Sequence, residues 1–241
     1  MANKYYARDE RRAAKVSDLF ATIAPRYDLV NDLQSFGLHR LWKRRLVKLA
    51  APAPGERALD LCCGTGDVAF ALARRGVEVT GLDFSEAMLR VARKRAETSP
   101  KSNVQSPAFL WGDAQKIPFP DGAFDIVTMG YGLRNLADWG QGLAEMGRVS
   151  KRGGRLLVLD FGKPDHPVWR ALYFGYLRAC VPLFGRIFCG DSQTYGYILE
   201  SLRHYPAQHG VAARMRDLGF RDIRIVLLLG GMMTINYGVK P

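Results

Sequence analysis

The turn at residues 59–67, LDLCCGTGD, combines glycines with carboxylates. Glycine lets a strand turn sharply into a helix and lets a ligand approach bare backbone, so Gly64 and Gly66 indicate a nucleotide-type site. The sequence from Gly64 onwards also fits the loose dinucleotide fingerprint G-x-G-x-x-A. Asp60 and Asp67, however, would repel a pyrophosphate from the positive end of the helix, whereas they suit a cation. The turn therefore favours S-adenosylmethionine, which carries a sulfonium and an ammonium and no phosphate, over NAD or FAD.

Two further acids follow the next expected strands. Asp83 ends a strand about 20 residues after Asp60, where a carboxylate accepts hydrogen bonds from the ribose hydroxyls of an adenosine ligand. Asp113 follows the third strand and is placed to accept from the adenine amino group. Each has a plainer alternative, a helix cap for Asp83 and an ordinary loop acid for Asp113. The predicted donor contacts are Asp60, Gly64, Thr65, Gly66, Asp83, Asp113, Ala114 and Gly130.

Residues 129–135, MGYGLRN, follow the fourth expected strand, where an acceptor should meet the methyl group. Glycines at this point permit close approach of donor and acceptor. Enzymes that methylate amino groups of nucleic acids tend to place a polar residue, two prolines and an aromatic here, and this loop has no proline. Arg134 and Asn135 instead suit an oxyanion such as a phenolate. The alternative is an arginine that pairs with a surface acid.

Strands and helices alternate after the glycine turn, which predicts a doubly wound α/β sheet. The chain ends differently, with two strands joined by a Gly-Gly turn as a hairpin. Five strand–helix units closed by a hairpin are the plan of class I S-adenosylmethionine-dependent methyltransferases, a Rossmann-like, seven-stranded sheet with an antiparallel last strand. We expect one domain over 1–241, with an N-terminal helical arm at 1–50 and a helical insertion at about 164–204. The expected strands are 57–63, 77–83, 108–111, 124–129, 155–160, 221–229 and 232–239.

The composition of the 241 residues is ordinary for a globular protein except for a formal net charge of +12. Such a charge suits nucleic acid, an anionic membrane surface or acidic substrates, and it also occurs in enzymes of arginine-rich proteomes. No apolar run reaches the ~18 residues of a membrane span, and the polar N-terminus is not a secretory signal. The cysteines predict a reduced, cytoplasmic protein, and the scattered histidines predict no metal site.

Two longer motifs carry a family resemblance. Residues 27–43, YDLVNDLQSFGLHRLWK, resemble the N-terminal signature of the ubiquinone/menaquinone biosynthesis C-methyltransferase family, and residues 148–156, RVSKRGGRL, resemble its second signature. The chain is thus similar to this family, in particular to its demethylmenaquinone methyltransferase type, over nearly its whole length. It departs from the family at Arg152, where proline is usual, and at Asp160, where glutamate is frequent.

The resemblance implies methyl transfer from S-adenosylmethionine to a ring carbon of a prenylated quinol. That carbon becomes nucleophilic when the neighbouring hydroxyl loses its proton. We expect Arg134, with Asn135 beside it, to stabilise the phenolate or to orient a water that takes the proton. Tyr27 and His39 are further candidate catalytic residues, and a structural hydrogen bond is the alternative for His39. The choice between a naphthoquinol and a benzoquinol stays open.

A polyprenyl tail must be shielded from water or remain in lipid. The aromatic insertion, with Trp169 and Tyr173, predicts a lid over the tail. Residues 36–50 form an amphipathic helix whose apolar stripe includes Leu41 and whose basic face predicts peripheral contact with the cytoplasmic side of the membrane. Nucleic acid is not an expected partner, and a homo-oligomer stays open.

Two other functions are alternatives at this point. The first is a methyltransferase that acts on another lipophilic phenol or on a sterol. The second is a non-catalytic module that binds RNA or membrane and keeps a donor pocket for stability, because a fold does not establish a function.

Overall fold

The computed structural model describes residues 35–98, 105–189 and 193–241, together with residues 12, 15, 16, 18 and 32. Its strands are β1 (Arg57–Leu61), β2 (Glu78–Asp83), β3 (Ala108–Trp111), β4 (Phe124–Gly130), β5 (Ser150–Phe161), β6 (Arg221–Leu228) and β7 (Met233–Val239). They form a seven-stranded sheet in the order β3-β2-β1-β4-β5-β7-β6. The first five strands run parallel, and β7 is antiparallel to both of its neighbours. The predicted fold class is confirmed.

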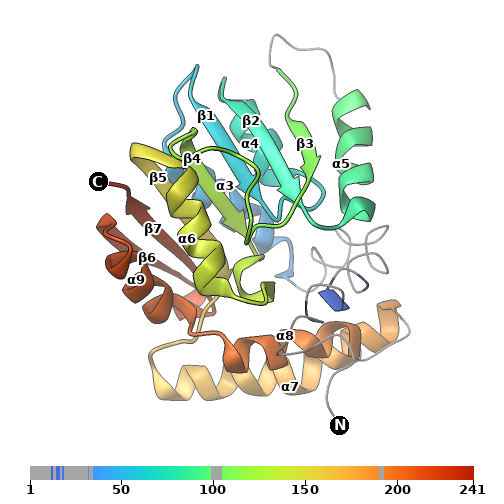
Figure 1. Cartoon of the computed structure of the whole chain (residues 1–241). Helices are drawn as coiled ribbons and strands as arrows, with labels where there is room; N and C mark the ends of the chain where they lie inside the picture. The colour runs from blue at the N-terminus through green and yellow to red at the C-terminus, as the bar shows by residue number, and fades with distance from the viewer. Residues whose placement is uncertain are drawn as a thin grey trace.

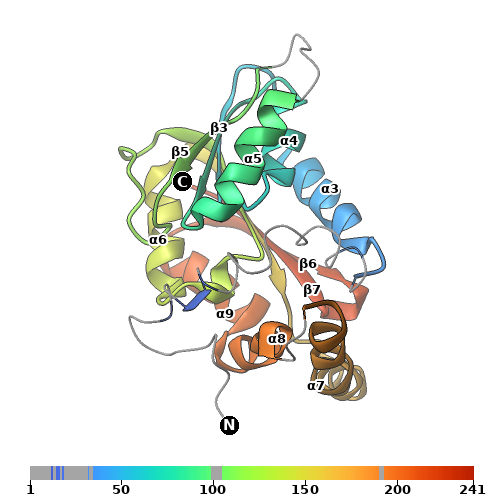
Figure 2. The ribbon, with the colours of Figure 1, turned by 90° about the vertical axis from the view of Figure 1, so that its right-hand side faces the viewer.

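The central strands bury most of their side chains because helices cover both faces of the sheet. The strand β1 is buried from Ala58 to Leu61, and β4 is buried from Ile126 to Met129. Figure 1 and Figure 2 show the helices in two layers. One layer consists of α3 (Leu38–Ala50), α4 (Asp67–Ala73) and α5 (Glu86–Thr98), and the other of α6 (Trp139–Val149) and α9 (Ala207–Asp217).

Each face of the sheet has its own apolar cluster. Leu46 of α3 and Leu72 of α4 belong to one cluster with Ile126 of β4. Met146 of α6 belongs to the other with Val127, the next residue of the same strand. Successive side chains of a strand point to opposite faces, so one apolar run supplies both clusters.

Two long helices, α7 (Pro167–Cys189) and α8 (Gln193–His204), occupy most of the segment 164–204. They lie across the carboxyl ends of the parallel strands, at the bottom of Figure 1. The helix α7 begins at Pro167, where the missing N–H of proline has no helical partner to lose, and it continues through Pro182. No helix in the described part of the chain has the length and apolar character that a bilayer crossing requires.

The helix α3 begins at Leu38, two residues later than expected, because Phe36 and Gly37 both have positive φ (49° and 73°). Its inner side is buried at Leu46 and at neighbouring apolar residues. Leu41 was expected on that apolar stripe but is 54% exposed, and Phe36 is 83% exposed. The exposed basic residues of this helix are Arg40, Arg44, Arg45 and Lys48.

Candidate active site

The chain leaves β1 through a tight turn and enters α4 at Asp67. Gly64 and Gly66 have positive φ (55° and 90°). A Cβ on Gly66 would lie 2.8 Å from Cζ of Phe109, so this glycine is required for packing. A Cβ on Gly64 would meet nothing within 4 Å, because Gly64 borders a cavity. The turn therefore presents bare backbone to that cavity.

This main cavity opens at the carboxyl ends of β1, β2 and β4. Most of the predicted donor contacts line it, namely Gly64, Asp83, Asp113, Ala114 and Gly130. Asp60 and Thr65 line a second, adjoining cavity, called the side cavity below. Gly66 is absent from the described lining of both, since its role in the turn is internal packing.

Asp83 holds the end of β2 against the glycine turn. Its Oδ2 accepts the backbone N–H of Gly64 at 2.8 Å, and its Oδ1 accepts that of Ser85 at 2.8 Å. Burial raises the pKa of Asp83. Ser85 is the residue that caps α5, since its Oγ accepts the N–H of Met88 at 3.4 Å. Each Asp83 oxygen keeps acceptor capacity, so the carboxylate suits a pair of ribose hydroxyls.

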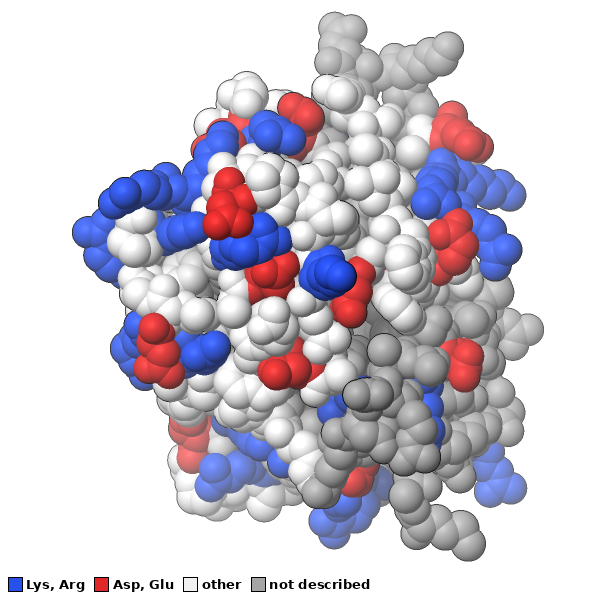
Figure 3. All heavy atoms as spheres, viewed as in Figure 1, with Lys and Arg blue, Asp and Glu red and all other residues white. Residues whose placement is uncertain are grey.

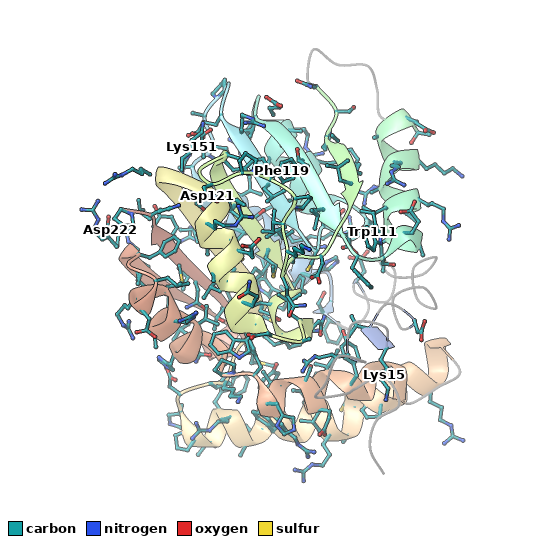
Figure 4. The ribbon with its side chains drawn as sticks, viewed as in Figure 1. Lys15, Trp111, Phe119, Asp121, Lys151 and Asp222 are labelled. Atoms are coloured by element: carbon teal, nitrogen blue, oxygen red, sulfur yellow. The ribbon has the colours of Figure 1, made fainter. Side chains whose placement is uncertain are left out.

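The walls of the main cavity beyond Asp83 are mainly apolar. Phe84 and Met88 line it, and the sequence analysis did not name either, because a methionine at helical spacing is typical of core. Trp111, at the carboxyl end of β3 in Figure 4, packs against Phe84 with ring centroids 5.4 Å apart and the ring planes tilted by 37°. Asp113 accepts the N–H of Gln115 at 2.8 Å. A cavity with apolar walls and few oriented polar groups suits a planar base.

The side cavity lies against the glycine turn and contains a buried acid. Asp60 accepts a hydrogen bond from Oγ1 of Thr128 at 2.8 Å. Burial raises the pKa of Asp60 to about 7. A nearby positive charge would favour the ionised form of this carboxyl and lower its pKa again. The two cavities adjoin through the shared wall residues Cys62, Gly64, Gly130 and Tyr131.

Asp67 has its charge compensated within the protein, although the sequence analysis counted it among the acids that attract a cationic ligand. Nζ of Lys43 lies 2.8 Å from its Oδ2, and Nη2 of Arg95 lies 2.9 Å from its Oδ1. Burial acts to raise its pKa, but Lys43 and Arg95 together lower it to about 2. The favourable charge for a cationic ligand therefore comes from other acids.

Arg134 lies in the short helix η2 (Leu133–Asn135) after β4 and is almost completely buried. Its Nη1 lies 3.0 Å from Oδ1 of Asp160 and donates to the carbonyl of Tyr131 at 2.7 Å. Its Nη2 donates to the hydroxyl of Tyr197, on α8, at 3.0 Å. The guanidinium also lies 4.5 Å from the ring centroid of Phe161. Its ion-pair partner is thus a buried acid at the end of β5, where the alternative had proposed a surface acid.

Asn135 directly follows Arg134 and lines the main cavity. Its Nδ2 donates to the carbonyl of Tyr131 at 3.1 Å, and its buried Oδ1 accepts from no described residue. The guanidinium of Arg12 donates to the backbone carbonyls of Arg134 and Asn135, in the latter case at 3.1 Å. Arg12 was not predicted as a site residue, because one arginine in a polar, basic segment gives no local signal.

His39 is buried at the start of α3. Its Nε2 lies 2.8 Å from Oδ1 of Asp32, and its backbone N–H donates to Oγ of Ser35 at 3.2 Å. Burial lowers its pKa, so the ring tends to be neutral at physiological pH. His39 is not among the described residues that line either cavity, a position that suits the structural alternative. Tyr27 lies outside the described residues.

The model of the ubiE/COQ5 methyltransferase family matches residues 7–240. The chain belongs to this family. The "Ubiquinone/menaquinone biosynthesis C-methyltransferase UbiE" of Ectopseudomonas mendocina (strain ymp) is 40% identical to it, over 97% of this chain and 91% of that protein. The "Demethylmenaquinone methyltransferase" of Listeria welshimeri is 39% identical, over 96% of this chain and 98% of that protein.

Solved structures share the fold of this ubiE/COQ5 family member at low sequence identity. A SAM-dependent methyltransferase from Aquifex aeolicus matches with a TM-score of 0.62 and 19% identity, over 89% of this chain and 98% of that chain. The [4+2]-cyclase SpnF matches with a TM-score of 0.64 and 18% identity, over 95% and 97% of the two chains. One fold thus serves different reactions, so the family membership and not the fold assigns the chemistry.

Membership of the ubiE/COQ5 family makes the chain an S-adenosylmethionine-dependent C-methyltransferase. The residues present fit this donor. Asp83 has acceptor capacity for the ribose, and the apolar walls suit the adenine. The positive charge of the donor would favour the ionised form of Asp60, whose pKa burial raises to about 7.

The surface charge of this family member is mixed on the face over α6. In Figure 3, Lys and Arg lie interspersed with Asp and Glu on this face. Arg148 pairs with Asp121 and Lys151 pairs with Asp125, each at 2.8 Å. The described part of this face therefore lacks the uniform basic stripe that is typical of nucleic-acid binding.

Proposed function

We propose that this chain methylates a ring carbon of a prenylated quinol, and that the acceptor is of the demethylmenaquinol type. The loop from Tyr131 to Asn135 carries this proposal, because it borders the main cavity on one side and holds the buried Arg134–Asp160 pair on the other. A phenolate bound beside this loop would lie close to the donor, with the Arg134 guanidinium, which is paired with Asp160, behind the loop. The names of the two relatives, which refer to quinone biosynthesis and to demethylmenaquinone, support the same acceptor class.

The donor, when bound, supplies an electrophilic methyl group. The protein then has to make the acceptor carbon nucleophilic, and Arg134 does so by stabilising the negative charge on the neighbouring oxygen. Its guanidinium is held by Asp160, by the Tyr131 carbonyl and by Tyr197, so little reorganisation accompanies the charge. Guanidinium has too high a pKa to act as the base, so a water oriented by Arg134 takes the proton.

Tyr173, on α7, and Tyr205, which directly follows α8, are not candidates for that base. Burial raises the pKa of Tyr173 and raises that of Tyr205 well above its ordinary value. Both phenols therefore stay protonated at neutral pH. Both side chains are buried, and neither is among the described residues that line the two cavities.

The membrane side of the proposal rests on α3. This helix exposes Arg44 and Arg45 on its outer side, and the apolar Phe36 and Leu41 are exposed at its start. Exposed basic and apolar groups on one helix suit peripheral contact with an anionic bilayer, in which a polyprenyl tail is dissolved.

The test is methyl transfer from labelled S-adenosylmethionine to reduced demethylmenaquinone and, in parallel, to a demethoxy-type benzoquinol precursor. Product from the naphthoquinol alone is the expected result, and product from both would indicate a shared enzyme. The variant Arg134→Lys keeps the charge but loses the planar fork, so we expect turnover to fall about 100-fold with donor binding unchanged. No product from either quinol, with the donor still bound, would contradict the proposal and favour another lipophilic phenol or a sterol.

A further inference from the structure

The side cavity contains a basic residue that the function described so far does not use. Lys43 comes from α3, before the sheet begins, and lines this cavity together with Asp60, Gly64 and Tyr131. Its side chain is only 13% exposed. Among the described residues that line the side cavity, Lys43 is the one lysine or arginine.

The ammonium of Lys43 is held at the cavity wall by two contacts. Its Nζ lies 2.8 Å from Oδ2 of Asp67 and 5.9 Å from the ring centroid of Tyr131. Asp67 does not depend on Lys43 alone, because Arg95 pairs with its other oxygen at 2.9 Å. Lys43 can therefore turn toward a ligand without leaving the partly buried Asp67 carboxylate unpaired.

The donor carries three charged groups, and the acids of the site complement only two of them. Asp60 and the neighbouring acids suit the ammonium and the sulfonium. The α-carboxylate requires a cation. The side cavity adjoins the main cavity at Gly64 and Gly130, and the amino-acid end of an adenosyl ligand would project toward this junction. Lys43 lies at that point.

We propose that Lys43 binds the α-carboxylate of the methyl donor, so that the helix α3 contributes a residue to the donor site. The inference rests on the donor of the proposed function and is independent of the quinol acceptor. It assigns to α3 a positioning role in donor binding that is separate from any contact with lipid.

Calorimetric binding of two ligands to the full chain tests this directly. S-adenosylhomocysteine carries the α-carboxylate, whereas its decarboxylated analogue, 5′-S-(3-aminopropyl)-5′-thioadenosine, keeps only the ammonium. A charge-assisted hydrogen bond contributes about 1.5–3 kcal/mol, so the wild type should bind the first about 10- to 100-fold more tightly. Equal affinity of the wild type for both ligands overturns the proposal without any variant.

Variants then test whether Lys43 causes the difference in affinity between the two ligands. In Lys43→Met the preference for the carboxylate should largely vanish, and Lys43→Arg should retain most of it. Lys94→Met, the same change at an exposed position of α5, should leave both affinities unchanged. Asp67→Asn should keep the preference for the ligand with the α-carboxylate. Loss of this preference in Asp67→Asn would show that it depends on the Lys43–Asp67 ion pair and not on a contact between Lys43 and the ligand.

These measurements separate the inference from the proposed function, because no quinol takes part. Binding of both adenosyl ligands without discrimination contradicts only the role of Lys43. Failure of the wild type to bind either ligand contradicts the donor itself.

Discussion

Asp160 fixes both the backbone and the side chain of Arg134. Its Oδ2 accepts the Arg134 backbone N–H at 3.1 Å, and its Oδ1 lies 3.0 Å from the Nη1 of the same residue. The two side chains are 3% and 2% exposed. Removal of two charges from water offsets much of their attraction, so such a pair contributes more to position than to net stability.

The first prediction concerns this ion pair. Arg134→Met leaves the Asp160 charge buried without its partner and should lower the free energy of unfolding by about 3–5 kcal/mol. The double variant Arg134→Met/Asp160→Asn removes both charges and should recover most of that loss. Urea denaturation measures both, with the exposed Arg216→Met as a control that changes stability by less than about 0.5 kcal/mol. A double variant no more stable than the single one would contradict this account of the pair.

The second prediction concerns the pH dependence that Asp60 introduces. Its pKa is about 7 in the folded protein, against 3.8 for an ordinary aspartate. Between these values the folded state keeps a proton that the unfolded state has released, so this group makes stability fall as pH rises from about 4 to 7. Asp60→Asn removes this effect, and its stability relative to the wild type should increase by about 1.4 kcal/mol per pH unit in that range.

Urea denaturation of the wild type and Asp60→Asn at several pH values measures this difference. His39, whose pKa burial lowers, contributes the opposite slope, and it cancels in the comparison because both proteins contain it. A stability difference that stays constant from pH 4 to pH 7 would show that Asp60 is ionised throughout.

The third prediction separates the two glycines of the turn. At Gly66 a Cβ would lie 2.8 Å from Phe109 and 2.9 Å from Phe70, so Gly66→Ala should destabilise the fold by about 3 kcal/mol. At Gly64 the space is open, and Gly64→Ala should cost only about 1 kcal/mol of backbone strain. Gly64→Ala should nevertheless weaken S-adenosylhomocysteine binding, because its methyl group projects into the donor space. Calorimetry and thermal unfolding give both quantities, and the opposite ranking in stability would refute the assignment.

The fourth prediction concerns the outer side of α3. Arg44→Glu/Arg45→Glu should reduce co-sedimentation with vesicles that contain anionic phosphatidylglycerol, and added salt should weaken wild-type binding in the same way. Arg90→Glu/Lys94→Glu on α5 makes an equal charge change at exposed positions and should leave sedimentation unchanged. Equal losses for the two double variants would mean that net charge, and not the α3 face, drives the contact.

Local sequence was sufficient to predict that most of the proposed donor contacts lie close together. The glycine turn, Asp83 and Asp113 all follow strands, and the carboxyl ends of parallel strands meet at one edge of a sheet. Their convergence on one cavity therefore follows from strand order, which the alternation of elements and the closing hairpin already indicate. The family resemblance rested on two contiguous motifs, and it is confirmed.

Tertiary structure alone decided which charges meet. The sequence predicts that Asp67 faces a ligand. In the structure Lys43 and Arg95 approach it from two other helices and compensate its charge. Asp160 and Tyr197 reach Arg134 across 26 and 63 residues of sequence. Periodicity identifies the buried face of an element, but partners far apart in sequence depend on the angle and register at which the elements pack. Those features arise from the fit of many side chains at once, and no local motif encodes them.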